Sequence, residues 1–104
     1  MKNEDFIITK EDVSEATRLT ITGLVDSVNA EKFEHKLNEA LRDKKISIII
    51  NMSKVDYLCS TGIRVILKAY KDARESGGTL GIENPSESVR KVLVITSLDK
   101  TLTL

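Results

Sequence analysis

The feature of this sequence that most restricts its fold is a run of β-branched apolar residues near the middle of the chain. Residues 45–50 read Lys-Ile-Ser-Ile-Ile-Ile, which is typical of a central strand covered on both faces of a sheet. After a loop expected at residues 51–58, a helical apolar pattern begins near Gly62 and ends at Gly77–Gly78. A buried strand that leads through a loop into a helix predicts an α/β architecture.

The segment before this strand is predicted to form two strands and a helix. Residues 6–10 are mostly apolar, and residues 17–22 alternate polar and apolar side chains with the period of a half-exposed strand. Apolar residues then recur every three or four positions over residues 30–41, which predicts a helix. Ser27 or Asn29 is the predicted N-cap of that helix.

The segment after the second helix continues the alternation. Residues 79–82 predict a further strand, and Ser86 is the predicted N-cap of a helix whose apolar stripe covers residues 89–96. Leu102 and Leu104 predict a short last strand. This order of strands and helices favours an α/β fold with a mostly parallel sheet.

The length and charge of the chain exclude several classes of function. A chain of 104 residues predicts one domain over residues 1–104. Its 16 basic residues balance its 16 acidic ones, and its four aromatic residues are scattered, so direct nucleic-acid binding is not expected. No apolar run approaches the roughly 20 residues of a membrane span, and residues 1–5 are too charged for a signal peptide. We therefore expect a cytoplasmic protein without membrane insertion.

The residue types that metal, cofactor or enzyme chemistry requires are scarce. Cys59 and His35 are the only cysteine and histidine, too few for a structural zinc site or an internal disulfide. Gly77–Gly78 lacks the lysine and the spacing of a phosphate-binding loop, and His35 belongs to a predicted helix without catalytic partners. We therefore expect no metal, no cofactor and no enzymatic activity.

The segment with the most functional information runs from Val55 to Ile63. Ligand and partner sites of open α/β sheets gather at the carboxyl ends of strands, where this segment is predicted to lie. Ser60 falls at the predicted helix start, where unpaired backbone N–H groups and the helix dipole stabilise an anion by about 0.3–1 kcal/mol. Ser60 is therefore either a phosphate acceptor or simply the N-cap of the helix, and the residues alone leave both interpretations open.

Five stretches of the chain together resemble the STAS domain family, in its branch of anti-sigma factor antagonists. The most specific stretch, residues 51–62, reads Asn-Met-Ser-Lys-Val-Asp-Tyr-Leu-Cys-Ser-Thr-Gly and is similar to the family signature. The other four follow in the family order, at residues 23–26, 77–80, 84–89 and 92–98. Each stretch is short, and their shared order makes the resemblance specific.

The resemblance implies a mixed sheet of four or five strands with helices packed on it, and a role in partner switching. In that family the unmodified antagonist binds an anti-sigma factor that is also a serine kinase, which frees the sigma factor to engage RNA polymerase. The kinase phosphorylates the serine that matches Ser60, which ends binding, and a phosphatase resets it. Thr61 matches the neighbouring hydroxyl residue, and Gly62 allows close approach of the backbone.

We expect the partner-binding surface to surround this motif. Its predicted residues are Asp26, Asp56, Cys59, Ser60, Thr61, Gly62 and Arg64. Two of them depart from the family pattern, because Cys59 stands where an aspartate is usual and Arg64 where a glycine is usual. The cysteine keeps an alternative open, in which the chain is a non-phosphorylated STAS scaffold or the soluble subunit of a signalling or transporter assembly.

Overall fold

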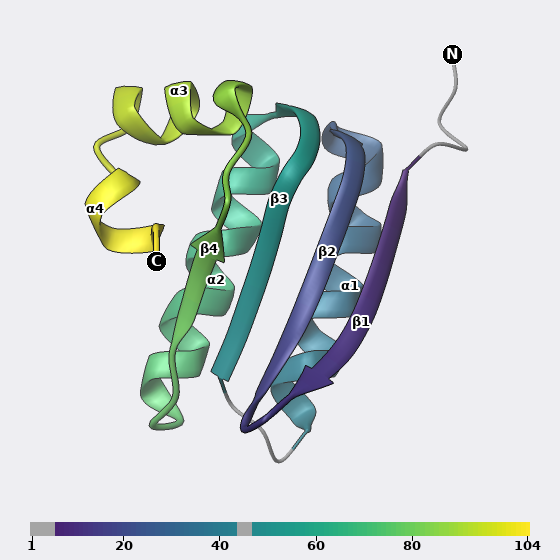
Figure 1. Cartoon of the computed structure of the whole chain (residues 1–104), viewed down its shortest axis with the longest axis vertical. Helices are drawn as coiled ribbons and strands as arrows, with labels where there is room; N and C mark the ends of the chain where they lie inside the picture. Colours follow the sequence, from purple (N-terminus) through teal and green to yellow (C-terminus); the bar gives the residue numbers. More distant parts are fainter. Residues whose placement is uncertain (1–5, 44–46) are drawn as a thin grey trace.

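A computed structural model describes residues 6–43 and 47–104 and contains strands and helices in nearly regular alternation (Figure 1). The strands are β1 (Ile7–Val13), β2 (Ala16–Val25), β3 (Ser47–Leu58) and β4 (Leu80–Glu83). The helices are α1 (Ser27–Arg42), α2 (Ser60–Glu75), α3 (Glu87–Ile95) and α4 (Asp99–Leu102). Lys45 and Ile46, the first residues expected in the central strand, lie outside the described part of the chain.

The strands form one four-stranded mixed sheet in the order β1-β2-β3-β4. β1 and β2 are antiparallel, whereas β2, β3 and β4 run parallel to one another. Figure 1 shows α1 and α2 side by side behind the sheet, with α3 and α4 beyond β4. This arrangement confirms the predicted α/β class and mixed sheet. β1 begins one residue after the predicted range 6–10 and runs on to Val13, and β2 extends beyond 17–22 at both ends, because the turn between the strands occupies only residues 14–15.

The hydrophobic core lies between the sheet and the helices α1 and α2. Ile48 and Ile50 of β3 are buried there with Phe33 of α1, and burying each such side chain contributes about 1.5–3 kcal/mol. Ile49, between the two isoleucines, is only half-buried on the opposite face. The expectation that the central strand is covered on both faces was therefore wrong, because α1 and α2 pack on the same side of the sheet.

β3 continues through the segment that was expected to be a loop. It runs to Leu58 and pairs with β2 along its length, with register shifts opposite Thr20/Thr22 and Gly23/Leu24. At each shift β3 contains one residue more than β2, which is the geometry of a β-bulge. Buried positions in this half of β3 consequently fall three residues apart, at Met52, Val55 and Leu58. Because a regular strand alternates every two residues, this spacing did not predict a strand.

The end of the chain is partly as predicted. Ser86 caps α3 as expected. Leu102 belongs to α4 rather than to a strand, and Thr103 forms an isolated parallel bridge with Ile82. The Leu104 N–H donates to the Ile82 carbonyl at 2.8 Å. The predicted last strand is therefore reduced to this single bridge beside β4.

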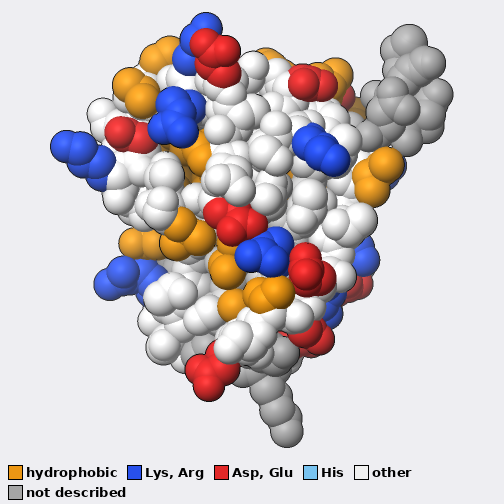
Figure 2. All heavy atoms as spheres, in the orientation of Figure 1, with side chains coloured by type: hydrophobic (Ala, Val, Ile, Leu, Met, Phe, Trp, Pro, Cys, Tyr) orange, Lys and Arg blue, Asp and Glu red, His pale blue; other side chains and the backbone are white. Residues whose placement is uncertain are grey.

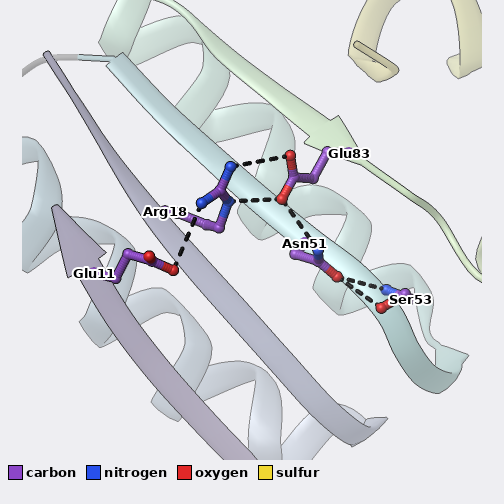
Figure 3. A network of polar contacts seen from close by, with 5 residues as sticks. All are labelled: Glu11, Arg18, Asn51, Ser53 and Glu83. Carbon is purple, nitrogen blue, oxygen red and sulfur yellow. Dashed lines mark hydrogen bonds and ion pairs between the residues drawn. The ribbon is translucent and has the colours of Figure 1, made fainter. Parts of the chain in front are cut away.

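The face of the sheet that α1 and α2 leave open carries a polar network across all four strands (Figure 3). Arg18 of β2 reaches across β3 to Glu83 of β4, with 2.7 Å between Nε and Oε2. Asn51 of β3 also donates to this carboxylate, at 3.0 Å, and Glu11 of β1 lies 3.6 Å from the Arg18 guanidinium. Figure 2 shows acidic and basic side chains side by side in the middle of this face.

This network predicts a specific acid sensitivity of the fold. The hydrogen bond from Arg18 lowers the pKa of Glu83, and the Asn51 amide lowers it further. Because the folded-state pKa lies below the unfolded-state value, the stabilisation is present above the unfolded-state pKa and is lost as pH falls through the folded-state pKa. We expect Glu83→Gln to reduce the loss of unfolding free energy between neutral and acid pH, as measured by urea unfolding.

The matched control for this prediction is Glu87→Gln, which neutralises an exposed carboxylate on α3. It should leave the pH dependence of stability close to that of the unmodified chain. Parallel pH curves for Glu83→Gln and the unmodified chain would contradict the role given to the Arg18–Glu83 pair.

Candidate functional site

The carboxyl ends of β2 and β3 lie side by side, and each leads directly into a helix. Val25 and Leu58, the last residues of the two strands, are register partners. The next residues are Asp26, the N-cap of α1, and Cys59, the N-cap of α2. The Cys59 N–H donates to the Val25 carbonyl at 2.9 Å. The first turns of α1 and α2 therefore start next to each other, at the edge of the sheet where α/β folds commonly bind ligands.

The two helix starts differ in the groups that cap them. The Asp26 carboxylate accepts from the Asn29 N–H at 2.8 Å, so the predicted caps Ser27 and Asn29 were both wrong. Asn29 is buried instead, and its side-chain amide donates to the Leu24 carbonyl. The charge of Asp26 offsets the positive end of the α1 dipole, which a neutral hydroxyl does not do.

The start of α2 has no comparable negative charge. The Cys59 Sγ accepts from the Gly62 N–H at 3.4 Å, and a thiol is a weak acceptor. No acidic residue lies in the first turn of α2. Ser60 is the first helical residue and is exposed, so the interpretation of Ser60 as the N-cap was wrong. Ser60 is therefore an exposed residue at a helix end whose partial positive charge is poorly compensated.

Gly62 lets this helix end sit close to the ends of both strands. A Cβ atom on Gly62 would lie 2.7 Å from Leu58 Cδ1 and 2.8 Å from Val25 Cγ1, closer than real Cβ contacts. Gly62 is buried and the adjacent Thr61 is half-buried, so the first turn of α2 is anchored on its inner side. Ser60 is consequently held in position on the outer side.

The remaining predicted site residues lie around this turn. Asp56 is exposed near the end of β3, and Arg64 is exposed on α2, one helical turn after Ser60. Within residues 6–43 and 47–104, Arg64 has neither an ion pair nor a hydrogen bond from its side chain. His35 lies elsewhere, on the exposed side of α1, where its Nε2 is 3.1 Å from Glu39.

Three exposed apolar residues in or near the motif were not among the predicted site residues. Leu24 and Tyr57 are register partners on β2 and β3, and their side chains are 45% and 52% exposed. Val28, in the first turn of α1, is 65% exposed. Val28 does not belong to the apolar stripe of α1. An apolar residue outside the stripe of its helix could have been predicted from the sequence to be exposed. We call these three residues the apolar trio; together they leave apolar surface uncovered beside the two helix starts.

The sequence of the chain matches one known protein family over most of its length. The model of the STAS domain matches residues 8–104. The chain belongs to the STAS domain family. The β2-α1 and β3-α2 junctions described above therefore belong to a STAS domain.

Several proteins of known name are similar to this chain in sequence or in fold. BtrV of Bordetella bronchiseptica is 31% identical over 72% of this chain and 65% of its own length. The chain thus matches slightly less than two thirds of BtrV. The anti-sigma-B factor antagonist of Bacillus subtilis is 31% identical over 78% of this chain and 73% of its own. The unphosphorylated anti-sigma factor antagonist SpoIIAA has the same fold, with a TM-score of 0.82, 22% identity, and coverage of 93% and 86%.

The described part of the STAS domain shows two further properties. Residues 6–43 and 47–104 contain no group of three or more histidine, cysteine or acidic side chains placed to hold a metal ion. None of the helices in these ranges combines the length and apolar content that a bilayer crossing requires.

The weak thiol cap of α2 leads to a stability prediction. Cys59→Asp should raise the free energy of unfolding by about 1 kcal/mol, because aspartate is a preferred N-cap and its charge opposes the helix dipole. For a STAS domain of this size that is a rise of about 5 °C in Tm. Thermal unfolding at neutral pH and at low salt measures it. Cys59→Ala should lower Tm, and an unchanged Tm for Cys59→Asp would show that the cap contributes little.

Proposed function

We propose that this STAS domain is a cytoplasmic anti-sigma factor antagonist that is switched by phosphorylation of Ser60. The observation that carries the proposal is the setting of Ser60, an exposed hydroxyl at the weakly compensated start of α2. The apolar trio beside it provides surface for a partner protein. The relatives named anti-sigma factor antagonists support an anti-sigma factor as that partner.

The physics of a phosphoryl group fits a switch at this position. It adds about −1.5 to −2 charges and three acceptor oxygens. In the free protein the start of α2 accommodates this charge, so the fold need not change. In a complex the same charge would face a packed surface and lose hydration, and a cost of about 4 kcal/mol weakens binding roughly a thousandfold. SpoIIAA, with the same fold at a TM-score of 0.74, has been solved in its phosphorylated form.

The test is phosphoryl transfer from the cognate anti-sigma factor, as a serine kinase, with ATP. We expect the mass of one phosphoryl group to be gained on Ser60, and a phosphatase to remove it. Ser60→Ala should abolish the gain, whereas Thr61→Ala should retain it. Absence of transfer, under conditions in which a standard antagonist is modified, would contradict phosphorylation. It would favour the non-phosphorylated scaffold or the soluble subunit of a signalling or transporter assembly, which Cys59 keeps open.

Arg64 provides a second test of the surface. Arg64 is exposed and, within the described residues, has no ion pair, and it lies one helical turn after Ser60, close enough to contact the same partner. We expect Arg64→Ala to weaken the complex about fivefold, or roughly 1 kcal/mol. Titration calorimetry with the anti-sigma factor measures this, and Lys71→Ala, an exposed cation farther along α2, is the control. Equal dissociation constants for Arg64→Ala and the unmodified chain would place Arg64 outside the interface.

A further inference from the structure

A hollow of about 320 Å³ opens between the edge strand β1 and helix α1. Its floor is formed by two apolar side chains, Phe6 and Ile8. Its rim is formed by three basic ones, Lys32, His35 and Lys36. None of the residues proposed for the anti-sigma factor surface lines it. Its volume falls at the lower end of the range for small-molecule sites.

The apolar floor of the hollow exists because β1 is the edge of the sheet. Ile8 pairs with Ile21 of β2, and Ile21 is fully buried beneath the helical layer. α1 packs over β2 and against α2, which leaves Phe6 and Ile8 at the margin of the core. Both are only half-buried, although residues of this kind are normally covered.

The rim of the hollow has an excess of positive charge. Lys32, His35 and Lys36 follow the spacing that places side chains on one face of a helix. Glu39 lies 3.1 Å from His35 Nε2 and 3.7 Å from Lys36 Nζ, and among the described residues it is the one carboxylate paired with this group. Lys32 has no ion pair or side-chain hydrogen bond within the described residues. No acidic side chain is among the described residues that line the hollow.

An exposed ion pair connects strand β1 to the end of helix α1. Lys10 of β1 lies 2.9 Å from Asp43, which follows α1 directly. This link connects the strand that supplies the floor to the end of the helix that supplies the cations. The pairing of β1 with β2 and the packing of α1 on β2 hold the two sides of the hollow near each other before any ligand arrives, which lowers the entropic cost of binding.

We propose that this hollow binds a small amphiphilic anion, namely a free carboxylate or phosphate ester with a short hydrocarbon or aryl body. The body packs on Phe6 and Ile8, and the head group pairs with Lys32 and Lys36. Neither half suffices alone, because a single exposed ion pair changes affinity by at most about fivefold and an uncharged body leaves both lysines unpaired. The proposal is independent of the switch at Ser60.

The test uses octanoate below its micelle concentration, titrated into the isotopically labelled full chain and followed by amide chemical shifts. We expect saturable shifts at Ile8 and His35, at least tenfold weaker binding of octanol, and no binding of inorganic phosphate alone. Lys32→Glu combined with Lys36→Glu should weaken octanoate binding at least tenfold. Lys71→Glu combined with Lys100→Glu, which makes the same change of charge at exposed lysines of α2 and α4, should not.

Several results would overturn the proposal. They are shifts that do not saturate, equal affinity for octanoate and octanol, or an unchanged affinity in the Lys32/Lys36 variant. Binding to phosphatidylglycerol vesicles without an octanoate site would also overturn it and indicate a membrane contact instead. If the double glutamate variant unfolds, Lys32→Gln and Lys36→Gln remove the charges without adding repulsion, and the same tenfold loss is expected.

Discussion

Replacing Ser60 by aspartate is expected to weaken the complex with the anti-sigma factor roughly thirtyfold, a loss of about 2 kcal/mol. Aspartate introduces one negative charge, about half of the charge of a phosphoryl group, at the same exposed position. In the free protein the α2 N-terminus tolerates this charge. At the proposed interface, which would also cover the exposed Leu24 and Tyr57, the carboxylate would lose its hydration without gaining a partner.

Titration calorimetry of three variants separates this effect from a general loss of structure. Ser60→Ala should bind within about twofold of the unmodified chain, because it removes a hydroxyl and adds no charge. Ser88→Asp places the same charge on an exposed serine in the first turn of α3 and should leave binding unchanged. Equal affinities of the Ser60→Asp and Ser60→Ala variants would remove Ser60 from the interface.

The second large effect concerns stability, because Gly62→Val is expected to lower the free energy of unfolding by about 3 kcal/mol. The first added carbon already lies within 2.8 Å of buried side chains of Leu58 and Val25. Val25 is fully buried and β-branched, so it has little freedom to move aside. The higher helix propensity of valine relative to glycine returns only a few tenths of a kcal/mol. Overpacking therefore dominates the result.

Urea unfolding measures this loss as a lower midpoint at an unchanged slope. Ser60→Val introduces the same side chain two residues earlier, at an exposed position, and should change stability by no more than about 0.5 kcal/mol. Gly62→Ala should fall between the two. A midpoint for Gly62→Val equal to that of the unmodified chain would contradict this prediction. It would mean that the ends of β2 and β3 move aside for the added side chain without a loss of stability.

Much of the fold was predictable from local periodicity. Residues 17–22 and 30–41 have the periods of a strand and a helix, and both elements are present. The extent of β3 was not predictable in this way. Two β-bulges change the spacing of its buried residues from two to three, and a bulge depends on pairing with β2, which a single segment does not reveal.

The candidate site was predictable in part for the same reason. The sequence motif places Ser60 at a junction between strand and helix, and Ser60 is the first residue of α2, directly after that junction. That Cys59, rather than Ser60, caps α2 depends on where β3 pairing ends. The exposure of Leu24 and Tyr57 as cross-strand neighbours depends on the register of two strands that are distant in sequence.

The sequence by itself determined the order of the elements from β1 to α3, the charge balance and the hydroxyl at the start of α2, because these follow from residue type and local spacing. Only the tertiary structure decided that α1 and α2 start side by side, that the apolar trio borders them, and that the edge strand leaves a hollow against α1. The physical reason is that strand register and helix packing are properties of contacts between distant segments. Local patterns constrain such contacts without specifying them.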